Sequence, residues 1–428
     1  MDTIGLGSGG ALSYRAAMTE APAILDSRYS WFRLCVTLLA GTVGGAGLWS
    51  VVIVLPAVQA DFGAERGWVS VAYTTTMVGF ALGNLVLGRI LDRHGVVLVI
   101  LAATVMSVAG YALAALMPSL IGLMVMQALI GVGASAFFGP LVADISHWFL
   151  RRRGIAVALV ACGNYLAGAL WPFLLGGLIV SGDWRSAYLV IAVALALTLP
   201  PLAMLLRRRL PEEAVATAAA SAALHSRRTD LSPATLQALL VVAAVGCCVA
   251  MAMPQVHIVA LCVDMGFGPA VGAEMLSMML LAGVVSRIVS GFLADRLGGV
   301  RTLLIGSGLQ CLALFLYLPA DGLTSLYVVS IVFGLSQGGI VPSYAIIVRE
   351  YMPPREAGAR VGVVMMATLL GMALGGWMSG AIYDLTGSYT LAFVNGIVWN
   401  GLNIAIVLLL ILRSRGTGPG ARQVATAA

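Results

Sequence analysis

Apolar runs of about 20 residues, each long enough to cross a hydrocarbon layer roughly 30 Å thick, recur along the chain. Lipid offers the backbone no hydrogen-bond partners, so a spanning segment must satisfy its own N–H and C=O groups and is expected to be a helix. The runs are centred near Gly45, Phe80, Ser107, Gly131, Gly168, Ala194, Gly246, Leu280, Gln310, Gly334, Gly371 and Asn403. The sequence therefore predicts an all-α membrane protein with twelve transmembrane helices.

A short pattern that closes one apolar run returns in the second half of the chain. Residues 88–95 read GRILDRHG and residues 291–298 read GFLADRLG, an offset of 203 residues. The same offset aligns three further pairs of glycines: Gly131 with Gly334, Gly168 with Gly371, and Gly177 with Gly380. Two six-helix bundles related by an axis along the membrane normal form one large class of transporter fold, and we predict this architecture here.

The basic residues predict how the chain is oriented in the membrane. All 24 of them are arginines, and most lie in alternate connections between the predicted spans or in the terminal segments. Arg66 and Arg185 lie in the other set of connections, and only Arg287 lies inside a span. By the positive-inside rule, both termini are expected in the cytoplasm. The net charge of +6 then reflects membrane topology, and no nucleic-acid partner is expected.

The longest break between spans divides the chain into two halves. We expect a cytoplasmic N-terminal segment at 1–30, a first bundle at 31–206, a cytoplasmic linker at 207–232, a second bundle at 233–412 and a cytoplasmic tail at 413–428. The N-terminal segment lacks the basic-then-apolar pattern of a signal peptide. We expect a protein of the bacterial inner (plasma) membrane, surrounded by lipid and functional as a monomer.

Motifs for metal, cofactor or catalytic chemistry are absent from the sequence. The six cysteines form no CxxC pair and no zinc-site spacing. There is no H-E-x-x-H motif, no cluster of acidic residues within a span and no phosphate-binding G-x-x-x-x-G-K-[ST] loop. We therefore expect no metal, no cofactor and no catalytic residue, so energy for transport would come from a gradient of ions or substrates.

The loop pattern Gly-x-Leu-x-Asp-Arg-x-Gly, found near both 88–95 and 291–298, resembles the signature of the major facilitator superfamily over essentially the whole chain. The stretches 146–156 and 383–389 resemble the monocarboxylate and oxalate–formate branch of that family. The stretch from Arg287 to Gly291 also resembles the eighth span of this branch. The resemblance implies that Arg287 binds the carboxylate of the substrate.

Three features depart from that branch. Many monocarboxylate carriers have an aspartate one turn before this arginine, where this chain has Gly283. Animal members use a lysine in the first span and the oxalate exchanger uses one in the eleventh, whereas this chain has no lysine. The usual proton-coupling groups are therefore absent, and so is a second fixed cation for a dicarboxylate.

Arg287 is also the main candidate from physical reasoning alone. It precedes Asp295, expected at the cytoplasmic boundary, by eight residues, or about 12 Å of helix, which is near the middle of the hydrocarbon layer. A mid-span arginine costs about 2.5–3.5 kcal/mol on insertion scales. Its planar fork of donors fits a carboxylate with two parallel hydrogen bonds. The alternative is an arginine satisfied by backbone carbonyls or a buried acid, but no acidic residue is expected at that depth.

Other polar or aromatic residues within the spans are further candidates for contact with the substrate. These are Asn84, the repeat mate of Arg287, together with Asn164, Tyr165, His257, Tyr344, Tyr73 and Trp377. His257 is also the candidate for proton coupling, because histidine titrates near physiological pH. A hydrogen-bonded core histidine is an equal alternative, and aromatic residues in membrane helices often only pack or lie at the interface.

Charged residues at the cytoplasmic ends of the spans are candidates for a gate. Asp92, Arg93, Asp144, Asp295 and Arg296 are expected to form ion pairs that latch the cytoplasmic side in one state and break in the other. In particular, we expect Asp144 to pair with Arg93. The alternative is that these residues only stabilise the loops.

These observations predict a secondary transporter of small organic anions that works by alternating access and is driven by a proton or anion gradient. The first alternative is a transporter of the same fold that exports drug-like or cationic compounds, which would favour an acid in the central cavity. A membrane receptor that does not transport is a remote alternative. A membrane-embedded enzyme would need a nucleophile–base pair or a metal cluster, which the spans do not offer.

Overall fold

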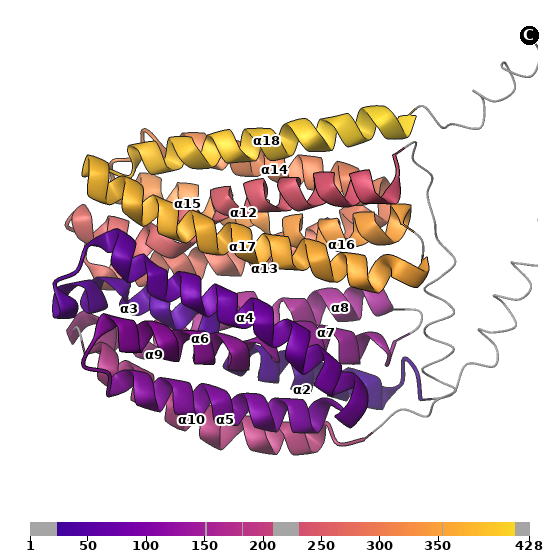
Figure 1. The fold of residues 1–428 in the computed structure, drawn as a ribbon, viewed down its shortest axis with the longest axis horizontal. Helices are drawn as coiled ribbons and strands as arrows, with labels where there is room; N and C mark the ends of the chain where they lie inside the picture. Colours follow the sequence, from indigo (N-terminus) through magenta and orange to yellow (C-terminus); the bar gives the residue numbers. More distant parts are fainter. Residues whose placement is uncertain (1–23, 150–151, 182, 209–230, 353, 416–428) are drawn as a thin grey trace, which may run out of the picture.

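The computed structural model describes residues 24–149, 152–181, 183–208, 231–352 and 354–415, and every regular element within them is a helix (Figure 1). Twelve spans in these ranges are long and apolar enough to cross a membrane, which confirms the predicted twelve-span, all-α membrane fold. Most of the predicted N-terminal segment, linker and C-terminal tail lie outside the described residues.

The first half of the chain forms six spans. They comprise α2 (Arg28–Gly44), α3 (Ala46–Phe62), α4 (Arg66–His94), α5 (Val96–Ala115), α6 (Leu120–Ser135), α7 (Gly139–Ser146), α8 (Arg153–Ala161), α9 (Gly163–Ser181) and α10 (Trp184–Leu205). The second half forms the other six. They comprise α12 (Pro233–Asp264), α13 (Pro269–Leu297), α14 (Gly299–Tyr317), α15 (Leu323–Gln337), α16 (Ile340–Tyr351), α17 (Pro354–Thr386) and α18 (Thr390–Arg415). Figure 1 shows the two halves side by side with their helices nearly parallel.

The repeated loop motif has the same conformation in both halves. Gly95 has φ 85° and Gly298 has φ 83°, a region that favours glycine because it has no Cβ. The amide of Gly95 donates to the Leu91 carbonyl at 2.9 Å, and the amide of Gly298 donates to the Ala294 carbonyl at 2.8 Å. Each glycine thus ends one span and turns the chain into the next.

Helix packing repeats in the same way. A Cβ on Gly131 would lie 2.1 Å from the Thr76 carbonyl oxygen, and a Cβ on Gly334 would lie 2.1 Å from the Met279 carbonyl oxygen. The two residues of the first contact and the two residues of the second are related by the offset of 203 residues. Small residues of this kind allow membrane helices to approach closely where lipid supplies no hydrophobic drive.

Four spans are interrupted near the middle of the bundle. The breaks separate α2 from α3, α6 from α7, α8 from α9, and α15 from α16. Pro140 and Pro342 lie in the first turn after two of these breaks, where the missing N–H of proline leaves no hydrogen bond unmade. Broken helices are tolerated at membrane depth where they line a cavity or are buried in protein. They therefore mark where a site is expected.

Different parts of the chain lie at the two ends of the bundle. The termini end, on the right in Figure 1, holds the start of α2 and the finish of α18. The opposite end holds the turn between α3 and α4. Large apolar side chains cover the outer surface between these ends, including Phe173, Ile121 and Leu197. Such a surface suits lipid, and the chain is an integral membrane protein.

Candidate functional site

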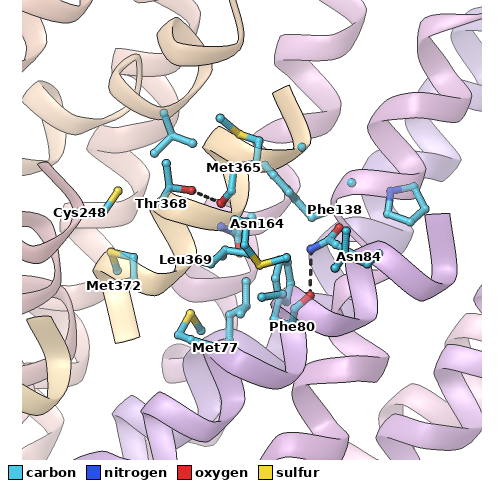
Figure 2. Close-up of a pocket in the computed structure, with 18 of the residues that line it drawn as sticks. Met77, Phe80, Asn84, Phe138, Asn164, Cys248, Met365, Thr368, Leu369 and Met372 are labelled. Atoms are coloured by element: carbon cyan, nitrogen blue, oxygen red, sulfur yellow. Dashed lines mark hydrogen bonds between the residues drawn. The ribbon is translucent and has the colours of Figure 1, made fainter. Parts of the chain in front are cut away.

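A central cavity of about 580 Å³ lies between the two halves. Its wall is formed by side chains from both halves, as Figure 2 shows for α4 and α17. The lining extends from Trp49 and Tyr73 to Gly88, Leu91 and Gly362 near the termini end. The cavity therefore reaches toward the termini end of the bundle.

Arg287 lies in the wall of this cavity and is only 5% exposed. Its Nε donates to the carbonyl oxygen of Gly338 at 3.1 Å, and its Nη1 donates to the carbonyl oxygen of Ala161. The guanidinium carbon lies 4.1 Å from the centre of the Tyr165 ring, a cation–π distance. Arg287 therefore joins α13 to the first half of the chain through α8 and α9.

The two carbonyls that accept from Arg287 lie at helix breaks. Ala161 is the last residue of α8, and Gly338 caps the end of α15. Helix C-termini carry unpaired carbonyls and a partial negative charge, so a guanidinium is stabilised there. The expected alternative, satisfaction by backbone carbonyls, is thus partly observed.

Arg287 nevertheless retains capacity for an anion. Among the described residues no carboxylate lies within ion-pair distance of it. A carboxylate in the cavity would supply the missing charge.

Gly283, one turn before Arg287, explains how Tyr165 reaches the guanidinium. A Cβ at position 283 would lie 3.0 Å from two ring carbons of Tyr165, closer than most real contacts. The absence of a side chain there allows the ring to pack against α13 and to cover Arg287. The position that holds an aspartate in many similar carriers is therefore occupied here by an aromatic ring from the other half.

Four of the other predicted substrate-binding residues also line the cavity: Asn84, Asn164, Tyr73 and Tyr165. Figure 2 labels Asn84 and Asn164 beside the open space. The Tyr73 hydroxyl makes no hydrogen bond to the described residues and remains able to contact a ligand, whereas the Tyr165 side chain interacts with Arg287. Whether these residues bind substrate stays a prediction.

The other three predicted substrate-binding residues lie outside the lining of this cavity, and their role stays a prediction. Trp377 is 43% exposed on the outer surface. Tyr344 donates to Asn403 at 2.8 Å within the second half, because the break between α15 and α16 turns its side chain into that bundle. His257 is fully buried and bonds to groups near the opposite end of the molecule.

A cluster of charged groups closes the opposite end. Arg66, at the start of α4, forms an ion pair with Asp264 at the end of α12, and it also donates to the Tyr389 hydroxyl at 3.0 Å. Asp384 of α17 accepts hydrogen bonds from the backbone amides of Arg66 and Gly67, at 2.9 and 2.5 Å. A carboxylate at a helix N-terminus satisfies free N–H groups and complements the helix dipole. We call Arg66, Asp264, Asp384 and Tyr389 the Arg66 latch.

The Arg66 latch joins the two halves, because only Arg66 comes from the first. Glycines allow this approach: a Cβ on Gly67 would lie 2.9 Å from an Asp384 carboxylate oxygen, and a Cβ on Gly380 would lie 3.1 Å from the Gly67 Cα. Among the described residues this is the only ion pair between the halves. The sequence offered a signal, since Arg66 is one of two arginines outside the pattern of the others.

His257 contacts the Arg66 latch through Tyr389. Its Nε2 lies 2.8 Å from the Gly376 carbonyl oxygen, which can only accept, so Nε2 carries a proton. Its Nδ1 lies 3.0 Å from the Tyr389 hydroxyl. Burial raises the pKa of the Tyr389 phenol well above its usual range, so this hydroxyl keeps its proton and can donate it to Nδ1. The arrangement fits a neutral histidine.

The ion pairs predicted for the cytoplasmic gate are not found among the described residues. Asp144 pairs with Arg33 of α2 at 2.8 Å rather than with Arg93, and its carboxylate accepts from both Nε and Nη2 of Arg33. Arg93, Asp295 and Arg296 are exposed and form no ion pair with a described residue, and the side chain of Asp92 lies outside the described part of the structure. A gate role for these residues stays a prediction.

Known proteins are similar to this chain over most of its length. The family model described as Major Facilitator Superfamily matches residues 37–323 and 238–426. Monocarboxylate transporter 13 of Rattus norvegicus is 27% identical, over 77% of this chain and 76% of that protein. The agnestins efflux protein AgnL12 of Paecilomyces divaricatus is 24% identical, over 76% of this chain and 73% of that protein. A solved POT family transporter in complex with 5-aminolevulinic acid shares the fold, with a TM-score of 0.68 at 12% identity over 90% of this chain and 96% of its own.

Proposed function

The chain belongs to the major facilitator superfamily, and from this premise we propose that it is a secondary transporter of organic monoanions whose carboxylate binds to Arg287. The observation that carries the proposal is a buried guanidinium in the wall of the central cavity with no carboxylate partner among the described residues. The name of the monocarboxylate transporter relative supports the same class of substrate. Because the family and these relatives transport solutes, the chain is not an enzyme.

Alternating access would operate between the two halves. With both termini in the cytoplasm, as the arginine pattern predicts, the cavity reaches toward the inside while the Arg66 latch closes the outside. Opening to the outside would require the latch to break. The charges of the predicted cytoplasmic gate would then come together; Arg93, Asp295 and Arg296 make no ion pair with a described residue in the present state.

Export of cationic compounds is the second candidate. It would favour an acid in the cavity, and no Asp or Glu lies among the described residues that line it. Export of an acidic compound remains compatible with Arg287 and with the name of the efflux relative. The direction of transport therefore depends on the gradient and not on the charge of the site.

Counterflow in proteoliposomes tests the transport proposal. Vesicles that contain the purified protein and an excess of unlabelled benzoate should take up labelled benzoate, whereas empty vesicles and vesicles with protein and unlabelled benzylamine should not. A receptor that does not transport would bind the acid without uptake. Uptake of labelled benzylamine by vesicles that contain unlabelled benzylamine, without uptake of benzoate, would favour the cation exporter instead.

Replacing Gly283 by Asp should convert the site to one with its own counter-ion. The new carboxylate would lie one helical turn from Arg287, the spacing at which side chains on a helix meet. We expect the affinity for carboxylates to fall at least about tenfold at neutral pH, because an internal ion pair competes with the substrate. Gly283→Asn is the matched control, since it displaces Tyr165 equally without the charge. Equal losses in both variants would show that only the contact with Tyr165 matters.

We propose that the candidate proton-coupling group, His257, acts on the Arg66 latch and not on the substrate. The charged or titratable groups that face it are Tyr389 from the segment before α18, Arg66 from α4, Asp264 on its own helix and Asp384 from α17. A proton on Nδ1 would prevent His257 from accepting the Tyr389 hydrogen bond and would add a positive charge near Arg66. Protonation should therefore weaken the latch.

His257→Gln should flatten the pH dependence of transport. Glutamine can replace both hydrogen bonds but cannot titrate in this range. In the wild type, lower pH should favour opening of the opposite end, and in the variant the opening should not change with pH. The measurement is counterflow rate from about pH 4 to about pH 8, because a fully buried imidazole gains its charge only at low pH, with His94→Gln as the control for loss of another histidine. A wild-type pH profile retained in His257→Gln would exclude this residue from coupling.

A further inference from the structure

The wall of the central cavity away from Arg287 is mainly apolar. Five methionines contribute to it, and we call them the methionine shell: Met77, Met251, Met365, Met366 and Met372. Figure 2 shows Met77 from α4 and Met365 and Met372 from α17 around the same space. Methionine is flexible and polarisable, so such a wall can adapt to ligands of different shape.

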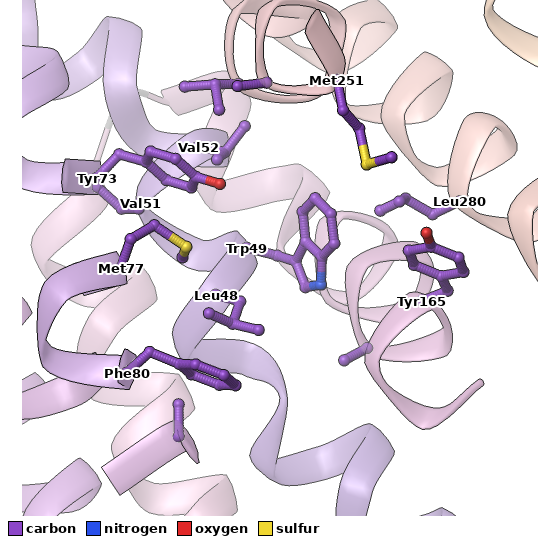
Figure 3. Packing of buried hydrophobic residues seen from close by; sticks show 14 of the residues in the cluster. Leu48, Trp49, Val51, Val52, Tyr73, Met77, Phe80, Tyr165, Met251 and Leu280 are labelled. Carbon is purple, nitrogen blue, oxygen red and sulfur yellow. The ribbon is translucent and has the colours of Figure 1, made fainter. Parts of the chain in front are cut away.

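Aromatic side chains complete the apolar wall. Figure 3 shows Trp49, Tyr73 and Phe80 with Met77, and it shows Met251 over the space next to Trp49. All of these line the cavity. Sulfur–aromatic contacts and offset ring packing both favour an aromatic or otherwise bulky apolar ligand in such surroundings.

The amide side chains in the wall use part of their hydrogen-bonding capacity within the protein. Asn84 donates to the backbone at 3.0 Å, the Asn164 side chain accepts from Trp49 at 3.2 Å, and Gln255 donates to another glutamine. The hydroxyl or keto group of a small acid would thus find few polar partners in the wall, namely the Tyr73 hydroxyl and the unused amide atoms of Asn84 and Asn164. A small acid would also leave most of the cavity filled with water against apolar walls.

We propose that the substrate is a bulky, largely apolar monocarboxylate, with its carboxylate on Arg287 and its aromatic or branched body against the methionine shell. This inference rests on the proposed function and adds the size and polarity of the substrate. The cavity volume of about 580 Å³ falls in the range of pockets that hold drug-sized ligands. Each methylene that the ligand buries should raise affinity about fourfold.

A series of acids tests this inference. Lactate, benzoate and naphthoate are titrated separately into the full-length protein in lipid nanodiscs, and each dissociation constant is measured in the wild type and in Arg287→Gln. We expect each ring to tighten binding at least about tenfold, with lactate weakest, and we expect all binding to weaken in Arg287→Gln. Lactate that binds as tightly as naphthoate, with both dependent on Arg287, would overturn the inference and leave the proposed function intact. Failure of every acid to depend on Arg287 would overturn both.

Two methionines on the same helix provide a matched pair of variants. Met251 lines the cavity, whereas Met253 lies two residues further along α12, is equally buried and is outside the lining. Met251→Ala should reduce the preference for naphthoate over lactate at least about fivefold, and Met253→Ala should leave that ratio unchanged. The ratio is independent of the fraction of protein that is folded. Met77→Ala, in the other half, provides the same test if Met251→Ala does not fold, and an unchanged ratio in the cavity variant that folds would contradict the proposal.

Discussion

Arg287→Gln is expected to reduce carboxylate transport by more than about 100-fold while the protein stays folded. A hydrogen bond to a charged group contributes about 1.5–3 kcal/mol, and a carboxylate on the guanidinium would make one or two such bonds and gain its charge partner. A loss of 3 kcal/mol corresponds to roughly 150-fold in affinity. Glutamine still offers an amide to the Gly338 or Ala161 carbonyl, so the packing around the helix breaks should survive. Counterflow of benzoate in proteoliposomes measures the effect.

One further variant separates the positive charge of Arg287 from the planar shape of its guanidinium, and a second serves as a control. Arg287→Lys keeps the positive charge and loses the planar fork, so intermediate transport is expected. Arg185→Gln removes an arginine that pairs with Asp61 within the first half at the opposite end, and it should transport normally. Wild-type transport by Arg287→Gln, or an equal loss in Arg185→Gln, would contradict the role assigned to the buried guanidinium.

Arg66→Gln is expected to open the opposite end of the molecule. Removal of one member of a fully buried ion pair costs about 3–5 kcal/mol. The Asp264 side chain is 24% exposed, so we expect about 2 kcal/mol here, or roughly a 30-fold shift between the two states of the transporter. The distance between spin labels at Glu65 and Ala270, which flank the Arg66 latch in the two halves, should become longer in the variant.

A double variant distinguishes the ion pair from a general loss of stability. Because Arg66 and Asp264 act on each other, Arg66→Gln combined with Asp264→Asn should open the molecule little more than either change alone. Arg185→Gln breaks the other ion pair at the same end, and it should leave the label distance unchanged because both of its partners belong to the first half. Additive opening in the double variant would show that Arg66 and Asp264 do not form a functional pair.

The spans and the duplication could be predicted from the sequence because both are visible as patterns along the chain. The length of an apolar run gives a membrane helix, and the offset of 203 residues identifies the glycine contacts that recur at Gly131 and Gly334. Arg287 could be located for the same reason: a lone arginine in a span needs a polar environment, and a cavity between the halves supplies one.

The remaining site residues show what the sequence lacks. Position along a span gives depth but not the face of the helix, so Trp377, which faces outward, and Tyr344, which faces its own bundle, could not be told from cavity residues. The Arg66 latch depends on pairing between residues far apart in the chain, and no local pattern identifies Asp264 as the partner of Arg66. The same limit applies to Asp144, whose partner is Arg33.

A structure of the protein with a bound brominated aromatic acid, such as bromobenzoate, tests the central claim most directly. The bromine is located independently by its anomalous scattering, and the carboxylate by its density. The account predicts a carboxylate oxygen within hydrogen-bond distance of an Arg287 guanidinium nitrogen and the bromine against the methionine shell. A carboxylate bound elsewhere, with Arg287 still held only by the Gly338 and Ala161 carbonyls, would contradict it.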